Sequence, residues 1–387
     1  MIKSQHIIWA IILADLLAGL LQTIEMPFFR IGLLLKSIII FFVFLKSLVK
    51  IKKKSIKSIY ISIAILSTFW LIGAFVSFTN YSEFSLSNSI VVLNRYLFFL
   101  ILSCAFLDWS TTEYFEIECK KIFERFLILN NAFIFIGFVF SVQVFKTYNE
   151  VYSNPDAIGR FGYKGLIFGQ NSVAAIYTLG IAFLFREYLV YKQKKTTLLI
   201  GTCLAAMLLG TKAAPITLVL LSLYFLLVYR VQTLIELVAP TLLGLSYLVI
   251  SNWNIVQERY LSFLLQKYET MDFYTFWTSN RNQLLSNALE RVSKHWSSIN
   301  FLVGDADSYV EMDFFDLYFF FGFGALVYFF VYFKIFFLKD KSRDNKYVFL
   351  VFMAMAFVAG HVINSAIVPL FLLLYVFSTR STQKQTD

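Results

Sequence analysis

Long apolar runs follow one another along most of the chain, and they constrain the fold more than any other feature. Each is close to the ~20 residues that an α-helix needs to cross the hydrocarbon core of a bilayer. About twelve such spans can be drawn. They fall at 6–24, 31–49, 59–78, 89–107, 126–145, 170–187, 196–211, 213–229, 232–251, 313–336, 347–363 and 366–379. The sequence therefore predicts an all-α, polytopic integral membrane protein with one membrane domain over residues 1–387.

Composition supports helices rather than strands as the spanning elements. The chain is 59% hydrophobic and holds 45 Phe but only 5 Pro, which fits helices whose outer faces touch acyl chains. The first apolar run contains Asp15 and exceeds a signal-peptide core, so we expect it to be retained as the first span. The last two runs are interrupted by His361, Asn364 and Pro369, so one kinked re-entrant hairpin is an alternative there.

The positive charge is gathered in short clusters between apolar runs. Dense clusters of Lys and Arg lie at 46–57, 186–195 and 339–346, each after an even-numbered span. Cytoplasmic loops of membrane proteins carry such an excess of basic residues. We therefore expect both termini to be cytoplasmic, and the net charge of +10 gives no reason to expect nucleic acid as a partner.

Residues 251–312 form the only long polar segment, between predicted spans 9 and 10, and we call this segment the lid. Within it, 282–296 has the spacing of an amphipathic helix, with Ser279 or Asn280 as its cap. Arg281 then falls in the first turn, where a cation opposes the helix dipole and does not serve helix stability. The predicted apolar face is Leu284, Leu285, Ala288, Leu289, Val292 and Trp296, and the polar face is Asn282, Glu290, Arg291 and Lys294.

Several cations lie on the predicted outer side of the membrane. The cytoplasmic excess of basic residues therefore does not explain them. They are Arg95, Arg160, Lys164, Lys212 and Arg281. Guanidinium groups bind phosphate oxygens in pairs, and lysine adds a point charge. Cations that converge at one interface therefore suit a lipid diphosphate, whereas each one taken singly is also explained as an interfacial residue that snorkels to water.

Lys212 has a distinctive setting among these cations. Ala206, Gly210 and Ala214 repeat every four residues around it, a spacing that lets membrane helices pack closely. We therefore expect Lys212 to lie inside the bundle, where a charged residue is a functional candidate.

Acids close the lid: Asp305, Asp307, Glu311, Asp313 and Asp316. A carboxylate at such a boundary can accept a proton from an attacking hydroxyl, and a solvated acidic rim is the alternative. No His accompanies the acids at ligand spacing, so no metal is expected. Walker and dinucleotide motifs are also missing from the sequence, so no cofactor is expected. His361 would either line the cavity or form hydrogen bonds at a helix end.

Three short motifs connect these residues to a known family. They are Gly159-Arg-Phe with Gln170-Asn171, Gly210-Thr-Lys-Ala-Ala214, and Asn280-Arg281 through Gly304 to Glu311-Met-Asp313-Phe-Phe-Asp316 and Gly322. With the spans and the late outer loop, the chain resembles the O-antigen polymerase and ligase superfamily. It is most similar to the oligosaccharide repeat-unit polymerases called Wzy. Relatives often carry Arg where Lys212 stands. The ligases have a His late in the loop, whereas Gly304 to Asp313 here offers acids and no His, which favours a polymerase.

The resemblance implies a metal-independent membrane glycosyltransferase in the bacterial cytoplasmic (inner) membrane. Its substrates would be undecaprenyl-diphosphate-linked oligosaccharides, joined at the outer face into O-antigen, capsule or exopolysaccharide. Arg160, Lys212 and Arg281, with Arg95, would bind the diphosphate, and Glu311 or Asp313 would accept the hydroxyl proton. Membrane lipid, a chain-length regulator and a flippase are the further partners that it suggests.

Three alternatives remain from the sequence. One is an O-antigen ligase, and another is a transporter or flippase for the same lipid-linked sugar, which would need charges at both depths of a cavity. The third is a structural partner in an envelope complex.

Overall fold

The structure is a computed structural model, and all structural statements below concern the residues that it describes. These are 4–23, 31–50, 53–81, 84–112, 114–147, 162–167, 169–229, 243–244, 246–247, 250–251, 253–255, 257, 265, 269, 272, 275, 278–307 and 310–378. Arg160, most of predicted span 232–251 and much of the first half of the lid lie outside them.

The described chain is helical, as predicted, and contains no strand, only an isolated bridge between Lys146 and Tyr163. In order, the main helices are α1 (Ser4–Thr23), α2 (Ile31–Leu48), α3 (Lys54–Asn80), α4 (Leu86–Trp109), α5 (Phe115–Phe140), α6 (Gln170–Phe185), α7 (Thr196–Leu208), α8 (Ala213–Tyr229), α13 (Arg281–His295), α14 (Ser298–Val303), α15 (Asp313–Phe321), α16 (Gly324–Phe336), α17 (Arg343–Ala359) and α18 (Val368–Ser378). Short pieces are η1 (Gln143–Phe145), the π-helical turn η3 (Arg186–Val190) and α10 (Trp253–Ile255).

Several of these helices can cross a membrane. In the described residues, 5 stretches are long and apolar enough, namely Ser4–Leu21, Lys54–Asn80, Leu86–Trp109, Phe115–Phe140 and Gln170–Val190. Shorter apolar helices are α7, α8, α16 and α18. The chain therefore has the character of a membrane-embedded protein.

Helix α5 begins at Phe115, well before the predicted start near 126. Its first turn carries Glu116 and Glu118, which flank the buried Phe115 and Cys119. The helix therefore begins before the apolar run, because one face of this first part already packs on the bundle while the rest bears charge.

The predicted span 313–336 consists of two helices, α15 and α16, separated at Gly322. Gly322 has φ +55°, and a Cβ there would lie 2.4 Å from the carbonyl oxygen of Leu302. The Phe323 amide donates to that same carbonyl at 2.9 Å. A close backbone approach from the lid therefore breaks the helix, and only glycine fits at the break.

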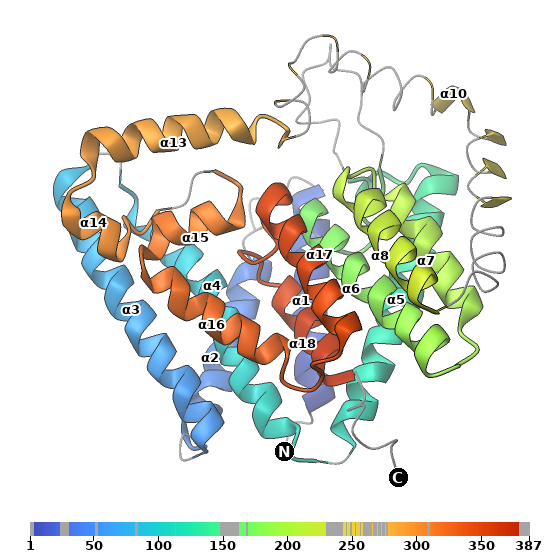
Figure 1. The fold of residues 1–387 in the computed structure, drawn as a ribbon, viewed down its shortest axis with the longest axis horizontal. Helices are drawn as coiled ribbons and strands as arrows, with labels where there is room; N and C mark the ends of the chain where they lie inside the picture. The colour runs from blue at the N-terminus through green and yellow to red at the C-terminus, as the bar shows by residue number, and fades with distance from the viewer. Residues whose placement is uncertain are drawn as a thin grey trace.

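One end of the bundle gathers the ion pairs between helix ends, and we call it the basic end. Its pairs are Lys53–Asp108, Lys120–Glu187, Arg186–Asp340, Lys195–Glu124 and Lys339–Glu116. At the opposite end, which we call the lid end, α13 lies across the bundle, transverse to the helices below it (Figure 1).

Three polar residues inside the bundle, Asp15, Asn130 and Asn131, join helices to one another. Lys36 Nζ lies 2.6 Å from Asp15 Oδ1. Asn131 Nδ2 donates to Thr202 Oγ1 at 2.9 Å. Asn130 Oδ1 accepts from the Leu166 amide at 2.7 Å, so these side chains fix how the helices and the loop before α6 meet.

The buried pair Arg186–Asp340 gives a stability prediction. Arg186→Met would leave Asp340 buried without its guanidinium partner, so the free energy of unfolding should fall by about 3 kcal/mol. Lys294→Met is the control, because the Lys294–Glu290 pair is exposed and such pairs contribute about 0.5 kcal/mol or less. The measurement is unfolding of purified protein in detergent, and equal losses in the two variants would contradict the prediction.

Candidate functional site

Helix α13 covers α15 through one apolar stripe. Ala288 packs in a cluster with Val310, Met312 and Phe319. Leu285, Val292 and Trp296 pack against the same cluster. The predicted helix 282–296 is thus observed one residue earlier, and its apolar face is narrower than predicted, because Leu284 and Leu289 are exposed.

Arg291, predicted on the polar face of this helix, turns toward the bundle instead. Its Nη2 lies 2.6 Å from Asp305 Oδ2, and Trp296 Nε1 donates to the same oxygen at 3.2 Å. Burial raises the pKa of Asp305 to about 6, and Arg291 opposes that rise. Asp305 is therefore held ionised at neutral pH by a partner from the lid helix.

The turn around Asp305 is also tied to the bundle through its backbone. Ser77 Oγ donates to the Asp305 carbonyl at 2.6 Å, and Ser89 Oγ donates to the Ala306 carbonyl at 2.6 Å. These contacts come from α3 and α4, so the end of the lid is fixed in place on the bundle.

The turn between α17 and α18 is organised by Asp313, the first residue of α15. Asp313 Oδ2 accepts hydrogen bonds from the Val362 and Ile363 amides, each at 2.7 Å. The Asn364 amide lies 3.4 Å from the other oxygen, and the Asp313 side chain is fully buried. The geometry of Asp313 is that of a group that positions a turn.

Asp316 has a similar setting one turn further along α15. Its Oδ1 accepts from the Val310 amide at 2.8 Å, inside the protein. Both acids of α15 therefore receive backbone amides, and neither lies at the surface.

Glu311 and the α17–α18 turn meet backbone to backbone. Gly360 has φ +60°, and a Cβ there would lie 1.8 Å from the Glu311 carbonyl oxygen. Glu311 and His361 also have positive φ, at 55° and 56°. Non-glycine residues adopt this region only where the surroundings hold them in it, so the two segments form one fixed unit.

Three charged side chains from separate segments meet at this unit. Arg281 Nη2 lies 3.6 Å from Glu311 Oε2, and His361 Nε2 lies 3.9 Å from Glu311 Oε1. The Arg281 side chain is 12% exposed and the Glu311 side chain 52%. We call Arg281, Glu311 and His361 the lid-end triad, a half-exposed carboxylate between a guanidinium and an imidazole.

Contacts within the triad shift the pKa values of His361 and Glu311. The interaction with Glu311 raises the pKa of His361, and burial opposes that rise. The interaction with His361 lowers the pKa of Glu311, and Arg281 acts in the same direction. Glu311 is therefore ionised at neutral pH and can accept a hydrogen bond from a hydroxyl.

The start of α6 supports the same turn. Asn171 Nδ2 donates to the Ala359 carbonyl at 2.7 Å, and Ser172 Oγ lies 2.9 Å from Ser365 Oγ. Arg281 Nη1 lies 3.4 Å from the Val358 carbonyl oxygen. Asn171 belongs to a motif singled out in the sequence, but its role at the end of α17 became visible only with the fold.

Lys212 lies at the lid end, between α7 and α8, and is partly exposed. The segment that follows Arg160 packs against the same hairpin. The Tyr163 amide donates to the Leu208 carbonyl at 2.8 Å, and a Cβ on Gly162 would lie 2.5 Å from the Leu209 carbonyl oxygen.

The remaining predicted cations lie deeper. Lys164 is 8% exposed, and burial lowers its pKa while Asp15 opposes that shift. Arg95 lies on α4 beside the fully buried Tyr96. The structure thus brings Arg281 to Glu311, while Lys212, Lys164 and Arg95 belong to other elements: the α7–α8 hairpin, the loop before α6, and α4.

No group of three or more His, Cys, Asp or Glu side chains in the described part of the chain has the arrangement of a metal site. Comparisons of the chain with protein-family models, with curated proteins and with solved structures found no match. The site is therefore interpreted from its own chemistry.

The triad predicts a pH dependence of stability. Because the pKa of His361 is raised above its ordinary 6.5, its contribution is complete below that value and is lost as pH rises through the raised pKa. The lowered pKa of Glu311 adds a contribution that is present above its ordinary 4.5 and is lost as pH falls through the lowered pKa. Both side chains are partly exposed, so the effect should stay below about 1 kcal/mol.

The measurement is the melting temperature across this pH range. In Glu311→Gln the fall with rising pH should be smaller and should be complete at lower pH, because only Asp313 and Asp316 then support the imidazolium. Glu290→Gln, on the exposed face of α13, should keep the wild-type profile near pH 6.5. An unchanged fall in Glu311→Gln would show that the pair does not form.

Proposed function

We propose that this protein is a membrane glycosyltransferase that polymerises oligosaccharide repeat units carried on undecaprenyl diphosphate. The observation that carries the proposal is the lid-end triad, in which Glu311 stands half-exposed between Arg281 and His361. An ionised carboxylate beside a guanidinium suits a reaction between a hydroxyl nucleophile and a phosphate leaving group.

The proposed topology has about twelve spans, with the basic end in the cytoplasm and the lid end outside. The lysine-rich clusters at one end support this orientation. The triad would then face the outer leaflet of the bacterial cytoplasmic membrane, the side on which the resemblance expects the polymer to grow.

The diphosphate would bind at the lid end through cations that approach from different elements. Arg281, from the start of α13, can donate to two phosphate oxygens at once. Lys212 would add charge from the α7–α8 hairpin. Arg160 and Arg95 complete the proposed set, and Gly162, two residues after Arg160 in sequence, packs on the hairpin that bears Lys212.

The reaction joins one sugar unit to another. The terminal hydroxyl oxygen of one lipid-linked unit attacks the first sugar carbon of the donor glycan, and a new glycosidic C–O bond forms. The bond between that carbon and the diphosphate oxygen breaks, and its electron pair leaves with undecaprenyl diphosphate. Glu311 takes the hydroxyl proton, and Arg281 stabilises the charge on the departing diphosphate.

Asp313 positions this machinery in the proposal. Its carboxylate is occupied by the Val362 and Ile363 amides, which set the place of His361 beside Glu311. Of the two acids considered from the sequence, Glu311 is therefore assigned to the proton and Asp313 to the turn.

Purified protein incubated with one lipid-linked repeat unit should lengthen the glycan without a gradient or a nucleotide. Arg281→Ala should slow lengthening about ten- to hundredfold, since hydrogen bonds to charged groups contribute about 1.5–3 kcal/mol. Glu311→Gln should lose about a hundredfold if Glu311 acts as a general base. The readout is the ladder of glycan lengths on a gel.

Controls come from the same helix. Lys294→Ala and Glu290→Gln change charges on the exposed face of α13 and should leave the ladder intact. Normal lengthening by both Arg281→Ala and Glu311→Gln, at equal protein levels, would refute the proposed site. Movement of the lipid-linked sugar across vesicles without lengthening would favour a transporter.

One observation favours the ligase as a second candidate. The segment from Gly304 to Asp313 contains no histidine, but the fold brings His361 to Glu311 from the α17–α18 turn, so a histidine does lie beside the acid. Supplying a lipopolysaccharide core as the acceptor separates the two activities. A ligase transfers the glycan to the core, and a polymerase extends only the lipid-linked unit.

A further inference from the structure

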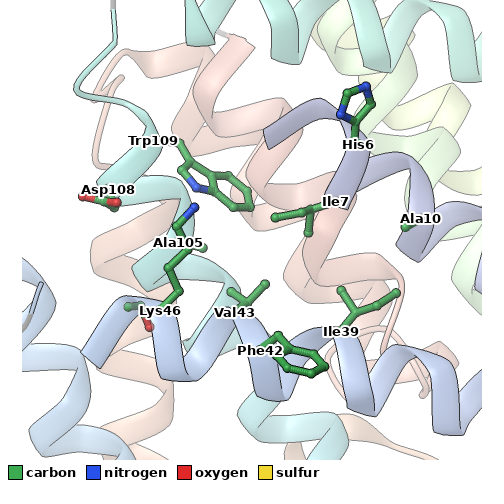
Figure 2. Close-up of a pocket in the computed structure, with 11 residues that line it drawn as sticks. His6, Ile7, Ala10, Ile39, Phe42, Val43, Lys46, Ala105, Asp108 and Trp109 are labelled. Atoms are coloured by element: carbon green, nitrogen blue, oxygen red, sulfur yellow. The ribbon is translucent and has the colours of Figure 1, made fainter. Parts of the chain in front are cut away.

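A groove at the basic end lies between α1, α2 and α4, far along the helices from the triad. Its volume is about 460 Å³. Figure 2 shows side chains from all three helices around it, with Ile39, Phe42 and Val43 along α2 and His6, Ile7 and Ala10 along α1. It is therefore built from separate elements.

The lining changes from polar to apolar along the helices. Lys46 and Ser47 stand at the end of α2, and Trp109 stands at the end of α4. Ile39 lies seven residues before Lys46, which is about 10 Å along a helix. A polar mouth at the helix ends and an apolar channel below it match a headgroup with the first part of an acyl chain.

Among the described residues, the positive charge at the mouth exceeds the negative charge. Asp108, the only acid among the described lining residues, already receives Lys53 Nζ at 2.9 Å and has Lys50 Nζ at 4.0 Å. Lys46 forms no ion pair with a carboxylate of the described chain. In Figure 2 its side chain points toward Trp109 and Asp108. Three lysines thus surround one carboxylate, and a negatively charged occupant would complete the balance.

One wall of the mouth consists of packed aromatic rings. The Trp109 ring lies 5.5 Å from the Phe106 ring and 5.9 Å from the Phe115 ring. Phe42, at the other side, is 65% exposed on a face that turns toward lipid in a membrane. An extended polypeptide entering from this face would leave its backbone groups without partners, whereas an acyl chain has no such groups.

We propose that this groove binds an anionic glycerophospholipid from the leaflet at the basic end. Its phosphate lies at Lys46, near His6 and Trp109, and one acyl chain follows Ile39 and Phe42 into the groove. The proposal does not depend on the chemistry at the lid end.

The test uses the full chain in a non-ionic detergent, titrated with dioleoylphosphatidylglycerol and, in parallel, with dioleoylphosphatidylcholine, by native mass spectrometry. Lys46→Gln should weaken retention of the anionic lipid about fivefold and leave the zwitterionic lipid unchanged. Lys57→Gln, an exposed lysine of the same end, should have no effect. Ala10→Phe, which fills the groove, should reduce retention of the anionic lipid.

A second readout protects the test against a misfolded variant. Phosphatidylglycerol with brominated acyl chains should quench part of the tryptophan fluorescence, and Trp109→Phe should remove that part. Equal retention of the anionic lipid by wild type, Lys46→Gln and Ala10→Phe would overturn the proposal. A dimer that forms without lipid and is lost in Ala10→Phe would also overturn it, because a second copy of the chain would then fill the groove.

Discussion

Two backbone amides that converge on one buried carboxylate hold the lid end of this protein together. Asp313 accepts from Val362 and Ile363, and the α17–α18 turn is thereby locked against the start of α15. Gly360 can then lie on the Glu311 backbone, and His361 can reach the Glu311 side chain. Without that carboxylate, the turn would bury amides with no acceptor, at a cost of about 1–3 kcal/mol each.

Much of the helical framework was predictable because long apolar runs have few alternatives in a bilayer. The bounds of α2 and α8 match the predicted spans closely, and the lid helix begins one residue from its predicted start. The predictions failed in detail where backbone contacts decide the structure. The break at Gly322 depends on the close approach of the Leu302 backbone. The spacing of apolar residues in this run does not predict that contact.

The site was predictable in part. Arg281 and Glu311 were singled out by their position in the sequence, and the structure places them together. Glu311 and Asp313 could not be told apart, because their difference is in the partners: one side chain is half-exposed and the other is buried against amides. Arg291 was assigned to a solvated face, although Asp305 draws it inward. The sequence pattern does not predict such ion pairs, because they depend on how the segments fold against each other.

The Val362 amide lies 49 residues beyond Asp313 in the chain, and this separation has a consequence for biosynthesis. During synthesis, every helix through α16 is complete before His361 and the amides of Val362 and Ile363 are added. Until then, the Asp313 carboxylate lacks these donors. A product truncated within or before α17 therefore lacks the amide partners of Asp313 and lacks His361, even when its earlier helices are complete. Cellular quality control that recognises an unfinished C-terminal hairpin would therefore also recognise an incomplete lid end.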